Sequence, residues 1–339
     1  MFGSDRYTAA AHAQRALPEP QGALDLEVIL RAASLAASSH NTQPWIFERG
    51  DGALAIHPDF TRRCPVVDPD DSHLFRSLGC AAENARIAAA AQRYTTSLDF
   101  DTAGGTLHLR FRPASAPLPE AALHSQIGAR QCTRSAYDPE PVAPEAVQTL
   151  IACGSAEGAI HALIEPEKRE AIAGLVHHGN LAQIANPAFF GELLAWVRFN
   201  PGEALATGDG LSSMATGKPN LPGWLGRRVL RFILTPKSQA AADDRLLATS
   251  PLLLAIVTPA NARADWVAAG RAYQRAALTA TALGLRHAFI NQPIEVGSLR
   301  PALMGVLGVA GHPSLLLRLG RAAPMPYSLR RPMEAVTRG

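Results

Sequence analysis

The stretch SLGCAAENARIAAAAQR, residues 77–93, carries the pattern that decides the fold, and AAGRAYQRAALTATAL, residues 268–283, repeats that pattern. In both stretches a glycine near the start leads into a helix of small residues, and a short apolar strand precedes the helix. The matching strands are 53–57 and 252–257, and a second helix-plus-strand likeness joins 24–37 to 145–153. This repetition predicts an α+β fold made of two diverged copies of one unit. A chance likeness between two alanine-rich helices is the alternative.

The composition indicates a folded chain with a large core. Of the 339 residues, 47% are hydrophobic and 18% are charged, and 32 basic residues against 29 acidic ones give a net charge of +3. Disordered chains combine low hydrophobicity with high charge, so intrinsic disorder is excluded. The small net charge and the 6% of aromatic residues argue against nucleic acid as the main partner. No apolar run reaches the roughly 18 residues of a membrane-spanning helix, so no membrane partner is expected.

The cysteines and the N-terminus bear on the compartment and on metal binding. The four cysteines lie far apart and form no CxxC pair, which argues against a zinc site and against a disulfide framework. The N-terminal residues lack the apolar segment of a leader peptide. We therefore expect a cytoplasmic protein without a bound metal.

The chain divides at a proline-rich linker. We expect an N-terminal extension over 1–23, a first half over 24–112, a linker over 113–119 and a second half over 120–339. Turn-forming residues dominate 200–226, which is too long for an ordinary connection. This segment is predicted to be a lid-like loop, and the residues near the C-terminus to form an irregular arm.

The string SSHNTQPW, residues 38–45, follows the first predicted helix directly. One interpretation is a helix stop, because serine and asparagine satisfy the last carbonyl groups and proline prevents continuation. A single polar residue would be enough for that purpose, whereas this string offers five hydroxyl or amide side chains within six positions. That density is typical of a site for a flat, polar ligand. The five are Ser38, Ser39, Asn41, Thr42 and Gln43.

Two arginine pairs are candidate phosphate ligands. RQCTRSAY, residues 130–137, places two arginines four positions apart, so on a helical turn both would face the same way and would need an anion between them. SLRRP, residues 328–332, holds two more in a tail that prolines stiffen. Solvated surface charge is the alternative for both pairs. The four residues are Arg130, Arg134, Arg330 and Arg331.

Motifs of other enzyme classes are missing from the sequence. There is no P-loop, no G-x-G-x-x-G and no G-x-S-x-G, and the histidines lack partners at the spacing of metal ligands. We therefore expect a bound cofactor, rather than a protein nucleophile or a metal, to carry the chemistry.

Taken together, SSHNTQPW, RQCTRSAY and PYSLRRP resemble motifs of the nitroreductase-like FMN-dependent oxidoreductases. The likeness is greatest to the long, two-halved, Acg-like branch, and it covers about residues 24–112 and 120–336. It implies the nitroreductase-like fold with its two halves fused into an intramolecular pseudo-dimer. It also implies a monomer with one composite site, because the Ser/Asn string lies in the first half and both arginine strings lie in the second.

The resemblance also implies roles for individual residues. Arg130, Cys132 and Arg134 would bind the phosphate and ribityl chain of FMN, with cysteine standing where the family has serine. Further family positions are implied for the flavin edge (Ser38, Ser39, Asn41, Gln43), the phosphate (Arg330, Arg331), the pyrimidine edge (Arg245) and the central ring nitrogen (Gln292, Pro293).

The function implied is hydride transfer from NAD(P)H through FMN to a flat acceptor, such as a nitro compound or a quinone, in a ping-pong cycle. A non-catalytic FMN-binding or FMN-storage protein, with the lid closed over the flavin, is the second hypothesis. A scaffold that has lost flavin is the third, and the intact SSHNTQPW string and both arginine pairs argue against it.

Overall fold

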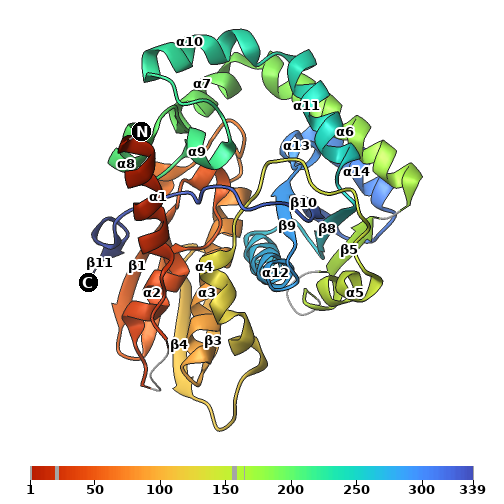
Figure 1. Cartoon of the computed structure of the whole chain (residues 1–339). Helices are drawn as coiled ribbons and strands as arrows, with labels where there is room; N and C mark the ends of the chain where they lie inside the picture. Colours follow the sequence, from red (N-terminus) through yellow and green to blue (C-terminus); the bar gives the residue numbers. More distant parts are fainter. Residues whose placement is uncertain (1, 20–22, 155–158, 164, 339) are drawn as a thin grey trace.

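Two long helices, one from each predicted copy, cross at the centre of the molecule (Figure 1). The computed structural model describes residues 2–19, 23–154, 159–163 and 165–338. On helix α3 (Ser72–Ala91), a Cβ atom at Gly79 would lie 2.2 Å from the carbonyl oxygen of Val267. On helix α12 (Arg263–Ala282), a Cβ atom at Gly270 would lie 1.9 Å from the carbonyl oxygen of Arg76. Both distances are far shorter than a van der Waals contact, so the glycines that open the two repeated stretches allow the crossing.

Polar contacts reinforce this crossing. The buried carboxylate of Glu83 on α3 accepts from Arg271 at 3.1 Å and from Arg275 at 2.7 Å, both on α12. The Asn84 side-chain oxygen accepts from Gln274 at 2.7 Å. The two halves are therefore joined by a buried, charge-assisted interface as well as by close helix packing.

Each half has its own sheet. The first sheet has the order β11-β1-β2-β4-β3, antiparallel except for a parallel pairing of β11 with β1. The second sheet has the order β5-β8-β10-β9 and is antiparallel throughout. The strands are β1 (Trp45–Gly50), β2 (Ala53–Pro58), β3 (Tyr94–Phe100), β4 (Leu107–Pro113), β5 (Ala159–Leu163), β8 (Leu252–Thr258), β9 (Arg286–Phe289), β10 (His312–Gly320) and β11 (Thr337–Arg338).

The predicted α+β class is confirmed, and the strands predicted at 53–57 and 252–257 are present. All seven residues of β8 are buried, as its unbroken apolar sequence indicates. The main core joins both sheets to α3 and α12, so the halves share one hydrophobic interior. The other helices of this body are α2 (Leu26–Ser34), α4 (His124–Ala129), α5 (Pro144–Ala152), α6 (Pro166–Ala185), α13 (Gln292–Glu295) and α14 (Arg300–Leu307).

The two chain ends contact each other, and the C-terminal end joins the first sheet. The N-terminal extension forms helix α1 (Phe2–Arg15), in which Tyr7 is buried. The Tyr7 hydroxyl donates to the carbonyl oxygen of Tyr327, in the C-terminal tail, at 2.7 Å. The tail crosses from the second sheet to the first and ends as β11 beside β1 (Figure 1). Strong burial of Leu329 and Arg330 shows that this tail is part of the body.

The segment 200–226 is not an irregular loop, so that prediction is wrong. It contains α8 (Pro201–Thr207), β7 (Leu211–Ser212), α9 (Ser213–Thr216) and the start of α10 (Gly223–Ile233). Its turn-forming residues serve as caps: the Asn200 side chain accepts from the Glu203 amide, and Gly208 and Gly217 end helices in the left-handed conformation. Around it lie α7 (Pro187–Trp196), β6 (Val197–Arg198), which pairs with β7, and α11 (Pro236–Ala248).

No helix of the described residues is both long enough and apolar enough to cross a membrane.

Candidate cofactor-binding site

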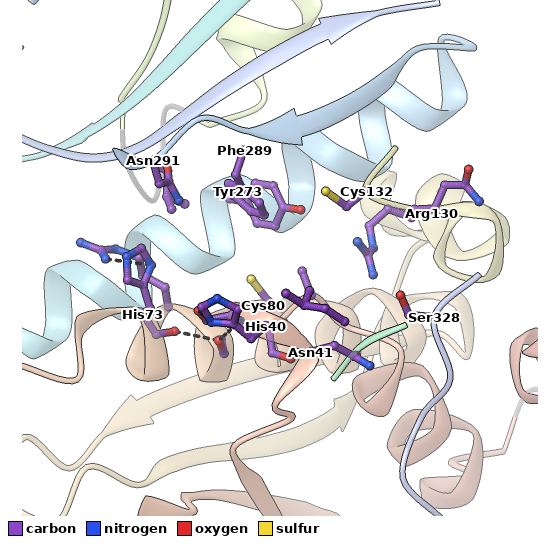
Figure 2. A pocket seen from close by; sticks show the side chains of 18 of the residues that line it. His40, Asn41, His73, Cys80, Arg130, Cys132, Tyr273, Phe289, Asn291 and Ser328 are labelled. Atoms are coloured by element: carbon purple, nitrogen blue, oxygen red, sulfur yellow. Dashed lines mark hydrogen bonds between the residues drawn. The ribbon is translucent and has the colours of Figure 1, made fainter. Parts of the chain in front are cut away.

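A cavity of about 220 Å³ opens between the two halves, beside the crossing of α3 and α12. One water molecule needs roughly 10–15 Å³ on this scale, so the cavity has room for a ligand of many atoms. Figure 2 shows Arg130 and Ser328 at one end, His73 and Asn291 at the other, and Cys80 and Tyr273 between them. Apart from these, the lining includes Arg15, residues 37–41, Arg76, Ser77, Gln131, Cys132, Arg134, Leu211, Phe289, Glu295, Leu315, Pro326 and Arg330.

The loop at residues 38–43 is held in a strained backbone conformation. His40, Asn41 and Gln43 all have positive φ angles, of 48°, 56° and 53°. These angles are uncommon for residues with a side chain, and they persist only where the surroundings enforce them. Ser38 contributes by accepting from the Gln43 amide at 3.0 Å. Some side chains of the polar string therefore stabilise the conformation of the loop.

Ser38, Ser39 and Asn41 line the cavity, whereas Gln43 does not. The fully buried Gln43 side chain donates to the carbonyl oxygen of Gly208, at 2.9 Å, and accepts from the Arg331 amide, at 2.8 Å. It therefore joins the loop to the segment 200–226 and to the C-terminal tail, and it does not face the cavity.

The chain at 130–134 is extended and not helical, so the predicted helical turn is wrong. Cys132 forms a parallel bridge with His287 next to the second sheet. In an extended chain every second residue points to the same side, and Arg130, Cys132 and Arg134 all line the cavity for that reason. Arg130 and Arg134, four positions apart, therefore point to the same side because side chains alternate along an extended chain.

Three buried arginines gather at one end of the cavity: Arg15 from α1, Arg130 from the extended segment and Arg330 from the tail. In the described part of the chain, none of them lies within ion-pair distance of a carboxylate. The Nε atoms of Arg15 and Arg130 are buried without a hydrogen-bond partner among those same residues. Burial and the neighbouring Arg130 lower the pKa of Arg15 to about 9, and burial lowers the pKa of Arg330 well below its usual range. The cluster therefore concentrates positive charge at one end of the cavity, where an anion would be stabilised.

Arg330 also supports the end of a helix. Its guanidinium donates to the carbonyl oxygens of Ser34, Leu35 and Ala36, at 2.9–3.1 Å, at the C-terminus of α2. It donates as well to the side-chain oxygen of Asn41, at 3.1 Å. A cation at a helix C-terminus satisfies unpaired carbonyl groups, so Arg330 fixes the strained loop against α2.

Besides Gln43, four more of the predicted ligands lie outside the cavity lining. Arg331 donates to carbonyl oxygens of Gln43 and Ala335, and Arg245 lies exposed on α11. Gln292 donates to Asn180 at 3.2 Å, and Pro293 is buried beside it. The neighbours Asn291 and Glu295 line the cavity instead.

A group of titratable side chains lines the end of the cavity opposite the arginines. Burial lowers the pKa of His40 to about 4 and that of His73 well below its usual range. Burial, with the nearby Asp68 carboxylate, raises the pKa of Glu295 to about 7, although Gln183 donates to it at 2.6 Å. Glu295 and His73 lie 3.8 Å apart. A carboxyl group with a pKa near neutrality can hold or release a proton at that end of the cavity.

Sequence reasoning missed Arg15, Tyr273, Phe289, Asn291 and Glu295. The only sequence signal for Asn291 and Glu295 was their place beside Gln292. Arg15 had no sequence signal, because the residues that it contacts lie more than a hundred positions away. It donates to the carbonyl oxygens of Gly128 and Arg130, and its guanidinium lies 4.2 Å from the ring centre of Tyr327.

No family model matches the sequence. The curated proteins nevertheless include relatives along almost the whole chain. A Mycobacterium tuberculosis protein named "Putative NAD(P)H nitroreductase Rv3131" is 27% identical over 325 residues, which is 92% of this chain and 90% of the relative. Another from that organism, "Putative NAD(P)H nitroreductase acg", is 24% identical over 331 residues, covering 94% and 97%.

The resemblance to the nitroreductases is confirmed by these relatives. The length of the matches also fits the long branch of the family. Among solved structures, a protein from Anabaena variabilis described as "a putative nitroreductase" aligns with 12% identity and a TM-score of 0.44 over 89% of this chain and 90% of that chain. The FMN-dependent nitroreductase NfnB from Mycobacterium smegmatis, in complex with NADPH, aligns with 15% identity and a TM-score of 0.40 over 65% and 98%.

Proposed function

We propose that this chain is an FMN-binding NAD(P)H oxidoreductase, and that the cavity between its halves is the flavin site. The observation that carries the proposal is the cluster of Arg15, Arg130 and Arg330, which is buried without a carboxylate partner among the described residues. Burying positive charge is unfavourable unless an anion joins it, and the phosphate of FMN is such an anion.

The rest of the cavity suits the other parts of the cofactor. Tyr273, Phe289 and Leu315 offer aromatic and apolar surface for a flat ring, while Ser38 and Asn291 offer polar groups for its edges. FMN, when bound, accepts a hydride from NAD(P)H and passes electrons to an acceptor, for which we propose a flat nitro compound or quinone. In this proposal Arg130, Cys132 and Arg134 bind the phosphate and ribityl chain, and Arg331 and Gln43 hold the tail and loop in place.

The two-halved organisation belongs to the same proposal. The cavity takes α3 and the Ser/Asn loop from residues before 112, and the extended segment 130–134 and Tyr273 from residues after 120. This arrangement supports an intramolecular pseudo-dimer in which a single chain, acting as a monomer in the cytoplasm, completes one site. The domain boundaries at 24–112 and 120–339 remain part of the proposal.

One observation favours the second candidate function, a non-catalytic FMN-binding protein. Leu211, from the segment 200–226, lines the cavity, and the Asn41 side chain donates to the carbonyl oxygen of Gly210, at 3.3 Å, in the same segment. A segment attached in this way could cover a bound flavin and exclude NAD(P)H.

An anaerobic absorption spectrum distinguishes the two functions. We expect the FMN-loaded protein to lose its yellow colour when NADPH is added. Reduction by dithionite but not by NADPH or NADH would support the storage function. A protein that does not bind FMN at all would contradict both.

A further inference from the structure

Helix α10 (Gly223–Ile233, GWLGRRVLRFI) exposes large apolar side chains to an unusual degree. Trp224, Phe232 and Ile233 are 69%, 78% and 58% exposed, and they are three of the seven large hydrophobic residues exposed among the described residues. Soluble surfaces rarely gather such residues on one short helix without a function. In Figure 1 the helix lies at the outer edge of the molecule, far from both sheets.

The helix is attached by its opposite face. Gly226 packs on the ring of Phe199 so closely that a Cβ atom there would lie 2.3 Å from a ring carbon. Trp224, Arg228 and Arg231 follow one another at spacings of four and three, so they share the outward face, with Phe232 at its border. This outward face therefore combines aromatic rings with guanidinium groups.

The surrounding sequence is basic without any acidic residue. Between Asp209 and Asp243 there is no aspartate or glutamate, although five basic residues occur there, including two of the three lysines of the chain. Two carboxylates of neighbouring elements are engaged within the molecule: Glu192 accepts from the amides of Val66 and Val67, and Glu203 accepts from the amide of Phe199. The five basic residues are Lys218, Arg227, Arg228, Arg231 and Lys237.

We propose that α10 docks this protein on an anionic lipid surface, lying in the plane of the headgroups. Tryptophan and phenylalanine favour the boundary between headgroups and acyl chains, and the arginines on the same face of the helix pair with lipid phosphates. The sequence prediction of no membrane partner rested on the absence of a spanning helix, which surface docking does not require.

The charge of this face favours a lipid surface over a second copy of the chain as the partner. A symmetric dimer through α10 would bring the arginines of one copy against those of the other, with no carboxylate on that face to separate them. Nucleic acid would match the charge, but Trp224 and Phe232, which are 69% and 78% exposed, gain more in a lipid boundary than along a phosphate backbone.

Vesicle flotation tests the proposal on the full chain. We expect binding to phosphatidylcholine vesicles that contain phosphatidylglycerol, weak binding to phosphatidylcholine alone, and release at about 0.5 M salt, where charges are screened within a few ångströms. A blue shift of tryptophan emission should accompany binding and should disappear in Trp224→Phe, because Trp45 and Trp266 are buried and the half-buried Trp196 ring is covered by the guanidinium groups of Arg62 and Arg198.

The variants provide matched comparisons. The triple variant Arg227→Gln, Arg228→Gln, Arg231→Gln and the double variant Trp224→Ser, Phe232→Ser should each lower the affinity for vesicles at least about tenfold. The control triple Arg93→Gln, Arg110→Gln, Arg112→Gln removes three exposed arginines elsewhere and should bind as the wild type does. Equal losses in the control, no vesicle binding, binding of duplex DNA in preference to vesicles, or self-association that Trp224→Ser abolishes would each overturn the proposal.

Discussion

At the scale of single residues, Arg330 has two tasks that the sequence could not separate. Its place in SLRRP suggested a phosphate ligand, and it does line the cavity. Its guanidinium also donates to three carbonyl oxygens at the end of α2. Neighbouring Arg331 is only half-buried and donates to two carbonyl oxygens nearby.

Arg330→Ala should therefore lower the free energy of unfolding by about 2–4 kcal/mol, because it leaves buried carbonyl groups unpaired. Arg331→Ala is the matched control and should cost less than half as much. Urea unfolding of the FMN-free protein measures both. Equal, small losses would mean that Arg330 does not support the helix end.

Glu295 gives a pH dependence with a definite sign. Its carboxyl has a pKa of about 7 in the folded chain, against 4.5 for the ordinary group. Between these values the folded state retains a proton that the unfolded state has lost, so the contribution of Glu295 to stability falls as the pH rises and is lost above about 7.

Glu295→Gln removes this titration. The stability of the variant relative to the wild type should rise by about 2–3 kcal/mol between pH 4.5 and pH 8. Chemical denaturation at both pH values checks this, with exposed Glu140→Gln as the control. A difference that does not change with pH would contradict the raised pKa.

At the scale of elements, the two glycine-led helices were predictable, and the segment beyond them was not. Gly79 and Gly270 occupy the crossing of α3 and α12, so the repeated pattern had a packing cause. The glycines and prolines of 200–226 were interpreted as residues of an irregular loop, whereas in the structure they begin and end short helices. Helix α1 gave little signal, because it buries few apolar residues, chiefly Tyr7 and Ala11.

The crossing can be tested with one methyl group. Gly270→Ala should destabilise the protein by at least about 2 kcal/mol, because the new Cβ atom would overlap the backbone of α3. Gly174→Ala is the matched control within α6, where nothing lies within 4 Å, and it should be neutral or should stabilise by up to about 1 kcal/mol. Thermal unfolding of the two variants distinguishes the effects; similar melting temperatures would contradict the close approach.

At the scale of the whole molecule, the candidate site draws on every part of the chain. The Ser/Asn loop, Arg130 and Arg330 could be found from local strings, because their residue types are unusual for a plain loop. Arg15 and Tyr273 could not, since only the folded chain brings α1, α12 and the tail around one cavity. The predicted side-chain directions of Arg245 and Arg331 were also wrong, because a short sequence motif does not determine which way each side chain points.

If one chain completes one site, flavin binding should not depend on dimerisation. We expect one FMN per chain and a monomer at low micromolar concentration, since the halves already bury their shared core within one polypeptide. Sedimentation monitored at the flavin absorbance measures mass and cofactor content together. Two flavins per chain, or flavin released as a dimer dissociates on dilution, would show that the pseudo-dimer is wrong.

The central claim is that the buried arginine cluster binds the phosphate of FMN. Fluorescence titration with FMN and with riboflavin, which lacks the phosphate, tests it most directly in the wild type and in Arg130→Gln. We predict that the wild type binds FMN at least about 100-fold more tightly than riboflavin, and that Arg130→Gln lowers this preference at least about tenfold. Equal affinities for the two flavins in the wild type would contradict the claim.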